Sequence, residues 1–286
     1  MSTKTETIEK DPSSAPTYIL QPTRGWVKLN FKEMWNYREL LYFLTWKEVK
    51  VRYQQTVMGV AWAIMQPAFS MIVFTIFFGK LAKMPSDGIP YPLFSYTALL
   101  PWTLFTSGVT KSANSLVGEA NLLKKVYLPR LFLPLAKNVA CLVDFFLAFI
   151  ILAGLFLYYD VSLTLNVLWL PIFIVLAFIT SWGVGLLLSA LNAQFRDVQY
   201  IVPFFIQMWL FITPVVYPTS MLPDAYKFVY SLNPMVGVVD GFRWALLGVG
   251  EGPGLTMFTS FTVTGIIFVI GLYYFNVMEK TFADVV

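Results

Sequence analysis

Residues 45–69 read TWKEVKVRYQQTVMGVAWAIMQPAF, and the character of the chain changes halfway along this stretch. The first half carries charged side chains at almost every second position, whereas the second half carries none. A charge-free run is compatible with the hydrocarbon interior of a bilayer, and a basic amphipathic helix suits the bilayer surface. The junction therefore predicts a surface helix that is followed directly by a membrane crossing.

The composition extends this interpretation to the whole chain. Of 286 residues, 57% are hydrophobic and 13% are charged, and the mean hydropathy is +0.66, which is too apolar for one soluble core. A helical crossing needs about 20 apolar residues, and continuously apolar runs favour helices over a barrel. The sequence predicts an all-α polytopic membrane protein with six transmembrane helices. The six runs are 57–79, 89–110, 138–159, a run within 161–195, 198–223 and 252–278.

The distribution of Lys and Arg predicts the orientation. With six crossings, the segments on the N-terminal side of the membrane hold 16 of the 20 Lys and Arg residues, which places both termini in the cytoplasm. The first residues contain no apolar signal region, and their Ser, Thr, Pro and charge content is typical of disorder. We expect a partly disordered cytoplasmic tail at 1–35, an amphipathic interface helix at 36–56 and a six-helix transmembrane domain at 57–286.

A helical plot of residues 37–55 separates two apolar stripes with basic residues between them. One stripe contains Tyr42, Trp46, Val49 and Tyr53, the other contains Leu40, Leu44 and Val51, and the basic flanks include Lys47, Lys50 and Arg52. This pattern favours a helix that lies at the membrane interface and contacts protein with its second stripe. The alternative is a helix that only anchors the chain to anionic lipid.

A second cytoplasmic segment, residues 118–137, contains a short amphipathic pattern that ends near Pro129. Its apolar side chains pair at i and i+4, while two lysines point away, which is a form that the groove of a partner can accept. The alternative is an ordinary basic inner loop. The residues that could contact a partner here are Leu122, Leu123, Lys124, Lys125, Val126, Tyr127 and Arg130.

Catalytic motifs are missing from the sequence. It has no His, no Asp-x-Asp, no phosphate-binding G-x-x-x-x-G-K-[ST] and only one cysteine, Cys141. Metal catalysis, imidazole chemistry and nucleotide binding therefore lack their usual residues, and we predict neither a metal site nor a cofactor in this chain. Asp144 is the one formal charge in the third run, with Lys137 two turns earlier. It indicates either ion coupling or a structural pair with a nearby base.

Several segments together resemble a known family. They are LTWKEVKVRYQQTVMGVAWAIMQP at 44–67, NLLKKVYLPRLFLPLA at 121–136, FRDVQYIVPFFIQMWLFITPVVYP at 195–218, LNPM at 232–235 and the terminal EKTFADVV. From about residue 18 to its end, the chain resembles the membrane subunit of ATP-binding-cassette polysaccharide exporters. These type 2 permeases move O-antigen, capsular or teichoic-acid polymers.

The resemblance implies a six-helix subunit that works as a homodimer in the bacterial inner membrane. Two copies of a separate ATPase polypeptide would bind ATP and Mg, and the substrate would be a lipid-linked polysaccharide rather than a nucleic acid. By position, residues 37–55 correspond to the interface helix of the family and residues 119–129 to its coupling helix. The family also has short re-entrant helices on the outer side, at 219–251 here, where SLNPM and GVGEGPG supply the breaks. The alternative for that loop is a surface-lying segment.

Aromatic side chains are candidates for a glycan channel, because a sugar presents C–H patches that aromatic faces can touch weakly. Lipid-facing aromatic belts are the alternative use of the same residues. The channel candidates are Trp62, Tyr96, Trp102, Phe105 and Trp209. Three functions stay open from the residues alone: an export permease, an ion-coupled secondary transporter that uses Asp144, and a membrane-embedded glycan transferase, which lacks metal-binding acids.

Overall fold

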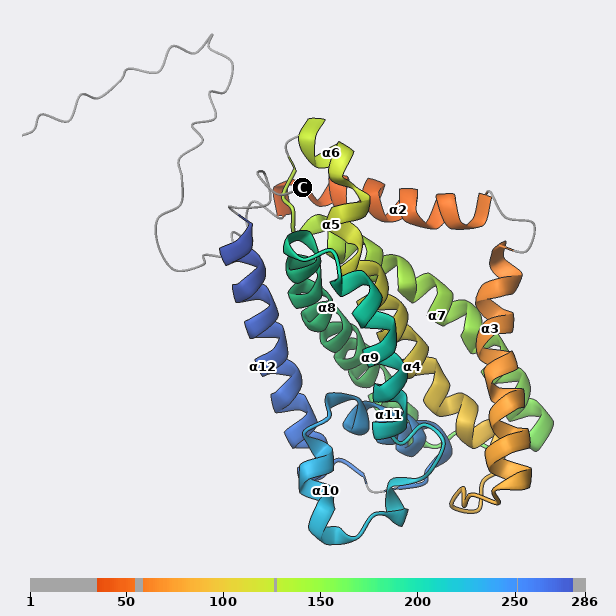
Figure 1. The fold of residues 1–286 in the computed structure, drawn as a ribbon. Helices are drawn as coiled ribbons and strands as arrows, with labels where there is room; N and C mark the ends of the chain where they lie inside the picture. The colour runs from red at the N-terminus through yellow and green to blue at the C-terminus, as the bar shows by residue number, and fades with distance from the viewer. Residues whose placement is uncertain (1–34, 55–58, 126–127, 251, 280–286) are drawn as a thin grey trace, which may run out of the picture.

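The computed structural model describes residues 35–54, 59–125, 128–250 and 252–279. All regular structure in these ranges is helical, and no strand occurs in them (Figure 1). The surface and long helices are α2 (Arg38–Gln54), α3 (Gly59–Phe74) with its π-helical extension η1 (Thr75–Leu81), α4 (Tyr91–Ala113), α7 (Phe132–Tyr159), α8 (Leu170–Gln194), α9 (Val198–Ile212) and α12 (Leu255–Met278). The short helices are α5 (Ser115–Gly118), α6 (Ala120–Lys125), η2 (Leu165–Trp169), η3 (Thr219–Met221), α10 (Asp224–Ser231) and α11 (Pro234–Leu247).

The long helices run side by side, with α2 and α6 at one end of the molecule and α10 at the other (Figure 1). Four of the described helices are long and apolar enough to cross a membrane: Gly59–Leu81, Phe132–Tyr159, Leu165–Gln194 and Leu255–Met278. They correspond to the first, third, fourth and sixth predicted runs. The all-helical, multi-pass prediction is therefore confirmed.

The second predicted run, 89–110, forms α4, which has 23 residues and is about 34 Å long at 1.5 Å per residue. Its sequence contains several Thr, Ser, Tyr and Pro residues, so it is less apolar than the four long helices named above. Most of its side chains are buried within the subunit, because α4 packs on α7, α8 and α11. A helix that protein surrounds in this way needs less hydrocarbon character than a helix that meets lipid.

The fifth predicted run, 198–223, was too long. Helix α9 ends at Ile212 and has 15 residues, or about 22 Å. Thr213 is extended because it precedes Pro214, which disfavours helical backbone in the preceding residue and has no N–H group of its own. The chain then continues through buried irregular backbone to η3.

The loop predicted to hold re-entrant helices contains two short ones, α10 and α11. The break between them falls in SLNPM: the side chain of Asn233 accepts a hydrogen bond from the Met235 amide at 3.0 Å, and Pro234 occupies the first helical position. GVGEGPG ends α11, with Gly248 in the left-handed conformation at φ 69°. Both predicted breaks coincide with helix boundaries.

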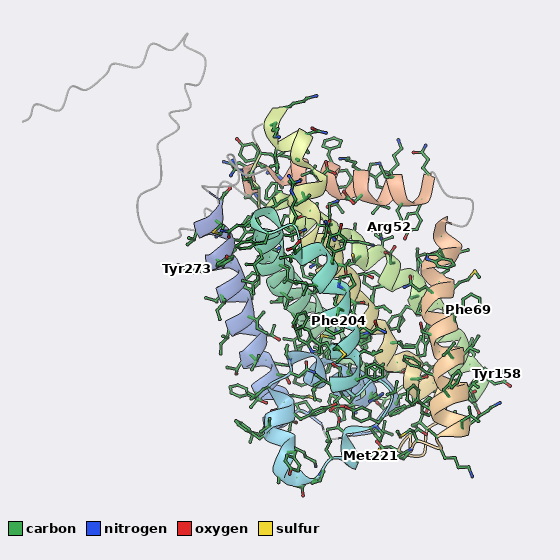
Figure 2. The ribbon with its side chains drawn as sticks, in the orientation of Figure 1. Arg52, Phe69, Tyr158, Phe204, Met221 and Tyr273 are labelled. Atoms are coloured by element: carbon green, nitrogen blue, oxygen red, sulfur yellow. The ribbon has the colours of Figure 1, made fainter. Side chains whose placement is uncertain are left out.

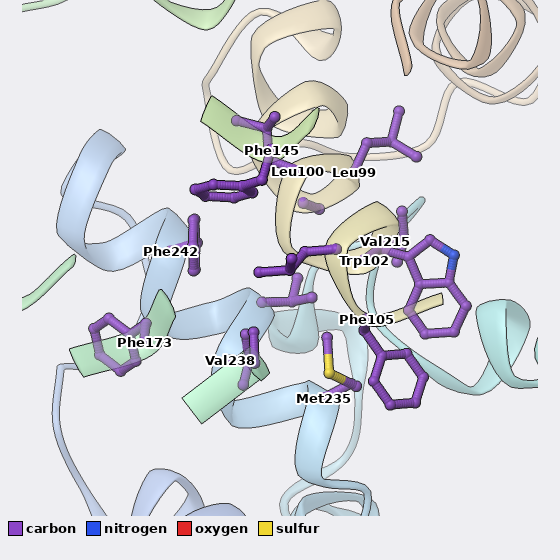
Figure 3. Packing of buried hydrophobic residues seen from close by; sticks show 14 of the residues in the cluster. Leu99, Leu100, Trp102, Phe105, Phe145, Phe173, Val215, Met235, Val238 and Phe242 are labelled. Carbon is purple, nitrogen blue, oxygen red and sulfur yellow. The ribbon is translucent and has the colours of Figure 1, made fainter. Parts of the chain in front are cut away.

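The core consists of two clusters of buried apolar side chains. The larger one surrounds α4 and α11, where Phe145 of α7 meets Phe242 edge to face at 6.2 Å between ring centroids (Figure 3). The second cluster, which includes Leu44, Leu116 and Phe132, lies beneath α2. It fixes α2 to the helical bundle.

Small residues allow α8 and α12 to approach closely. A Cβ atom added to Gly183 would lie 2.8 Å from the Cα atom of Phe268, and one added to Gly271 would collide with the Gly183 carbonyl. The hydroxyls of Thr180 and Thr264 form a buried hydrogen bond of 2.9 Å in the same contact. Close backbone approach with a bridging polar pair is typical of helix packing in membranes.

Candidate functional site

Helix α2 lies across one end of the bundle and has an inner and an outer face. Leu44 is buried against the second cluster, and Leu40 packs against it as predicted. Tyr42 and Trp46 are 64% and 54% exposed, so this part of the aromatic stripe faces outward. Val51 was predicted on the protein-facing stripe but is 53% exposed.

Tyr53 departs from the predicted aromatic stripe because its hydroxyl donates a hydrogen bond to Oδ1 of Asp144. The Arg52 guanidinium donates to Oδ2 of the same carboxylate, and the Lys111 ammonium lies 3.2 Å from Oδ2. Asp144 thus joins α2, α4 and α7 through one carboxylate. Figure 2 shows the position of Arg52 on α2. We call Arg52, Tyr53, Lys111 and Asp144 the Asp144 cluster.

The Asp144 cluster has the electrostatics of a structural ion pair. The Asp144 side chain is 21% exposed, and the two cations beside it are 23% and 32% exposed, so solvent screens the pairs only in part. Burial and the bond to Asp144 raise the pKa of the Tyr53 phenol well above its usual range, which keeps the hydroxyl a donor. Asp144 is thus paired with two bases, Arg52 and Lys111, which does not test whether it also takes part in ion coupling.

Two further ion pairs attach α2 to the bundle. Glu48 lies 3.3 Å from the Lys137 ammonium on α7, and Lys47 lies 2.9 Å from Glu119, between α5 and α6. Glu48, Lys111 and Glu119 were not among the functional residues predicted from the sequence. Each could have been noticed in the sequence, because Lys111 is a base directly after an apolar run and Glu48 and Glu119 are acids in basic segments.

Helix α6 (Ala120–Lys125) lies within the predicted coupling helix 119–129, and the last two residues of that range, 128 and 129, are not helical. Lys124 and Lys125 are exposed, whereas Leu122 and Leu123 are partly buried against the second cluster of their own subunit. Val126 and Tyr127 lie outside the described residues. The Arg130 guanidinium donates to the Glu279 carbonyl near the end of α12. The open surface of α6 is thus basic, and its leucines pack inward.

Four of the five predicted channel aromatics lie in or against the larger core cluster. Tyr96, Trp102 and Phe105 are 0%, 5% and 0% exposed, and the Tyr96 hydroxyl donates to the Ala148 carbonyl at 2.8 Å. Trp209 contacts Phe105 at 5.0 Å between ring centroids, and its indole N–H donates to Asn233 at 2.9 Å. Trp62 lies on α3 instead and is 56% exposed.

Helices α3 and α9 expose most of their apolar surface. Among their described residues, Pro67 is the buried residue of α3 and Val202 that of α9. Phe69 and Phe204, labelled in Figure 2, are 52% and 61% exposed. The exposed aromatic side chains of α9 are Tyr200, Phe204, Phe205 and Phe211. They were not singled out from the sequence, because a charge-free run does not reveal which of its faces the rest of the chain covers.

In the part of the chain that the structure describes, no three His, Cys, Asp or Glu side chains gather as metal ligands. The contacts described above hold α2 and α6 at one end of the bundle through side-chain ion pairs.

Comparison with known proteins agrees with this arrangement. Residues 39–247 match the ABC-2 type transporter family. The chain is 32% identical over 252 residues to the O-antigen export system permease protein RfbA of Klebsiella pneumoniae, covering 86% of this chain and 95% of that protein. It is 23% identical over 235 residues to the polysialic acid transport protein KpsM of Escherichia coli, covering 79% and 89%.

A shorter similarity, 28% identity over 89 residues, relates the chain to the inner membrane transport permease YadH of Escherichia coli (strain K12), covering 31% of this chain and 33% of that protein. The family match extends from α2 through α11, over most of the described structure. The chain therefore belongs to the ABC-2 type transporter family, as a multi-pass transport subunit without a catalytic domain.

Proposed function

We propose that this chain is the membrane subunit of an ATP-driven exporter that moves a lipid-linked polysaccharide, such as O-antigen, across the bacterial inner membrane. The observation that carries the proposal is its similarity to an O-antigen permease over 86% of the chain. From that relative we assign to this chain only the export of a polysaccharide, and we do not specify the glycan. An ion-coupled transporter and a glycan transferase are set aside, because the ABC-2 family relies on a partner ATPase.

ATP and Mg bind to the partner ATPase in this proposal, and two copies of that polypeptide serve two copies of this chain. The ATPase docks on α6, with Lys124 and Lys125 as the exposed basic contacts and Leu122, Leu123, Val126, Tyr127 and Arg130 around them. The Lys47–Glu119 pair of 2.9 Å joins this region to α2. Displacement of α6 by the ATPase would therefore be transmitted to α2 and, through the Asp144 cluster, to α4 and α7.

The homodimer forms through α3 and α9, and the glycan passes between the two copies. The support is the exposed apolar surface of these two helices, whose buried residues within one copy are Pro67 and Val202. Trp62 and the exposed aromatic side chains of α9 have the accessibility that a channel wall between copies requires. Tyr96, Trp102, Phe105 and Trp209 would support that wall from behind.

The proposed topology has six crossings, formed by α3 with η1, α4, α7, α8 with η2, α9 and α12. Residues 1–35 form the cytoplasmic tail, 36–56 the interface helix and 57–286 the transmembrane domain, with both termini in the cytoplasm. Helices α10 and α11 re-enter the membrane from the outer side, because neither is long enough to cross it.

The proposal is tested by purifying this chain with the ATPase encoded beside it and measuring ATP hydrolysis. We expect a stable complex whose hydrolysis rate increases with lipid-linked glycan from the same organism and does not increase with the lipid carrier alone. A purified complex that hydrolyses ATP at one rate with every glycan tested would overturn the substrate assignment. A chain that binds no ATPase would overturn the transport mechanism itself.

A further inference from the structure

A cavity of about 210 Å³ lies toward the end of the molecule that holds α10, opposite α2 and α6 (Figure 1). Its walls come from four segments: the turn before α4, η3 with the start of α10, one face of α11, and the connection from α11 into α12. None of its residues belongs to the coupling surface or to the aromatic candidates. The cavity therefore requires its own explanation.

Two carboxylates are held in place at this cavity by neighbouring hydroxyls of η3. The Thr219 hydroxyl donates to Asp240 at 2.6 Å, and the Ser220 hydroxyl donates to Asp87 at 2.8 Å. All four residues line the cavity. Each hydroxyl bond fixes the orientation of one carboxylate at the cavity wall.

Arg243 adds a fixed, buried cation to the cavity wall. It is 3% exposed, donates to the carbonyls of Pro214 and Val215 at 2.5 and 2.9 Å, and lies 3.6 Å above the Phe94 ring. Its Nε proton has no acceptor among the described residues. The Nε atom itself is buried, so Arg243 contributes a fixed positive charge to the cavity wall rather than a free donor.

The charges of the lining argue against a free ion as the occupant. Asp87 and Asp240 are balanced by Lys227 and Arg243, so the formal charge of the lining is zero. Such a lining attracts neither a lone cation nor a lone anion, but it offers charged hydrogen-bond donors and acceptors side by side. Val236 and Met257 supply apolar wall in the same cavity.

A ligand that matches this lining is a ring with hydroxyls at its edge and C–H groups on its face. The volume is somewhat larger than a cavity of about 150 Å³ that holds one benzene ring, which suits one monosaccharide ring rather than a chain. We infer that the cavity is a subsite that binds one sugar unit of the exported glycan at the outer end of the subunit. This inference rests on the proposed function and adds a binding site to it, away from the surface between copies.

The test measures binding of methyl glycosides of glucose, galactose and mannose to the purified full-length chain in nanodiscs, by saturation-transfer NMR. We expect at least one glycoside to receive saturation, and Asp240→Asn to weaken its binding by about tenfold through the loss of a charge-assisted hydrogen bond. Asp160→Asn is the matched control, because Asp160 is exposed, lies at the end of α7 and does not line the cavity. The control should bind as the parent does.

A second variant keeps the test decisive if Asp240→Asn does not fold. Val249→Trp fills the cavity from its rim and should also abolish saturation. The inference is overturned if no glycoside binds the parent at concentrations on the order of tens of millimolar. It is also overturned if binding survives both variants, or if Ca²⁺ binds stoichiometrically and Asp87→Asn abolishes it. Glycoside binding needs neither ATPase nor export, so its failure is distinct from failure of the proposed function.

Discussion

Replacing Asp144 by Asn removes one negative charge from the Asp144 cluster and leaves Arg52 and Lys111 without their shared counter-ion. The Lys111 ammonium lies 3.2 Å from the carboxylate, and the side chain of Asp144 is 21% exposed. Exposed pairs contribute about 0.2–1 kcal/mol, and breaking a fully buried pair costs about 3–5 kcal/mol. For this intermediate burial we expect a loss of about 1–3 kcal/mol.

Cys141 provides the assay, because it is the single cysteine of the chain, is buried and lies one helical turn before Asp144. A dye that fluoresces on reaction with thiols would report the temperature at which α7 opens. At about 2–4 °C per kcal/mol, Asp144→Asn should lower this temperature by about 2–12 °C. Asp197→Asn, at an exposed acid before α9, is the control and should leave it unchanged.

A double variant distinguishes loss of the Arg52–Asp144 ion pair from the effect of each side-chain replacement alone. If the charges interact as described, Arg52→Gln combined with Asp144→Asn should lower the temperature by less than the sum of the two single changes. The reasoning is refuted if the single change to Asn has no effect, or if the two changes are additive.

Three further outcomes follow from other parts of the structure. Lys124→Glu with Lys125→Glu should reduce the amount of ATPase that copurifies with the chain, because it reverses the exposed charge of α6; unchanged copurification at low salt would exclude α6 as the contact. Gly271→Val should destabilise the α8–α12 contact by several kcal/mol, seen as poor yield or a lowered unfolding temperature, since its side chain would meet the Gly183 backbone. In a Cys141→Ser background, cysteines at the exposed positions of Ser162 and Ser220 should react with an impermeant thiol reagent in spheroplasts, whereas a cysteine at Lys124 should not; the reverse pattern would invert the proposed topology.

The sequence was sufficient for the parts of the fold that depend on one segment at a time. Charge-free runs located α3, α7, α8 and α12, and local Pro and Gly signals located both ends of α11. The end of α9 could also have been predicted from nearby residues, because Pro214 lies just beyond it. The predicted run 198–223 was defined only by the absence of charges and did not take this proline into account.

The remaining features depend on contacts between distant segments. Tyr53 faces Asp144 from a position 91 residues away, and no helical plot of α2 alone could show this. The same applies to the aromatic candidates. Tyr96 and Phe105 are buried because α7 and α9 pack on α4, whereas Trp62 is exposed although α3 packs on α4 and α7. Apolar sequence identifies a membrane helix, but it does not distinguish a face that meets protein from one that meets lipid or a second copy.

Transport in proteoliposomes tests the central claim most directly. This chain and its ATPase would be reconstituted with lipid-linked glycan, and the fraction of glycan protected from an added lectin or glycosidase would be measured over time. The account predicts that ATP changes this fraction, that a non-hydrolysable ATP analogue does not, and that Lys124→Glu with Lys125→Glu abolishes the change. Glycan whose accessibility stays constant under ATP hydrolysis, in vesicles that contain an intact complex, would contradict the account.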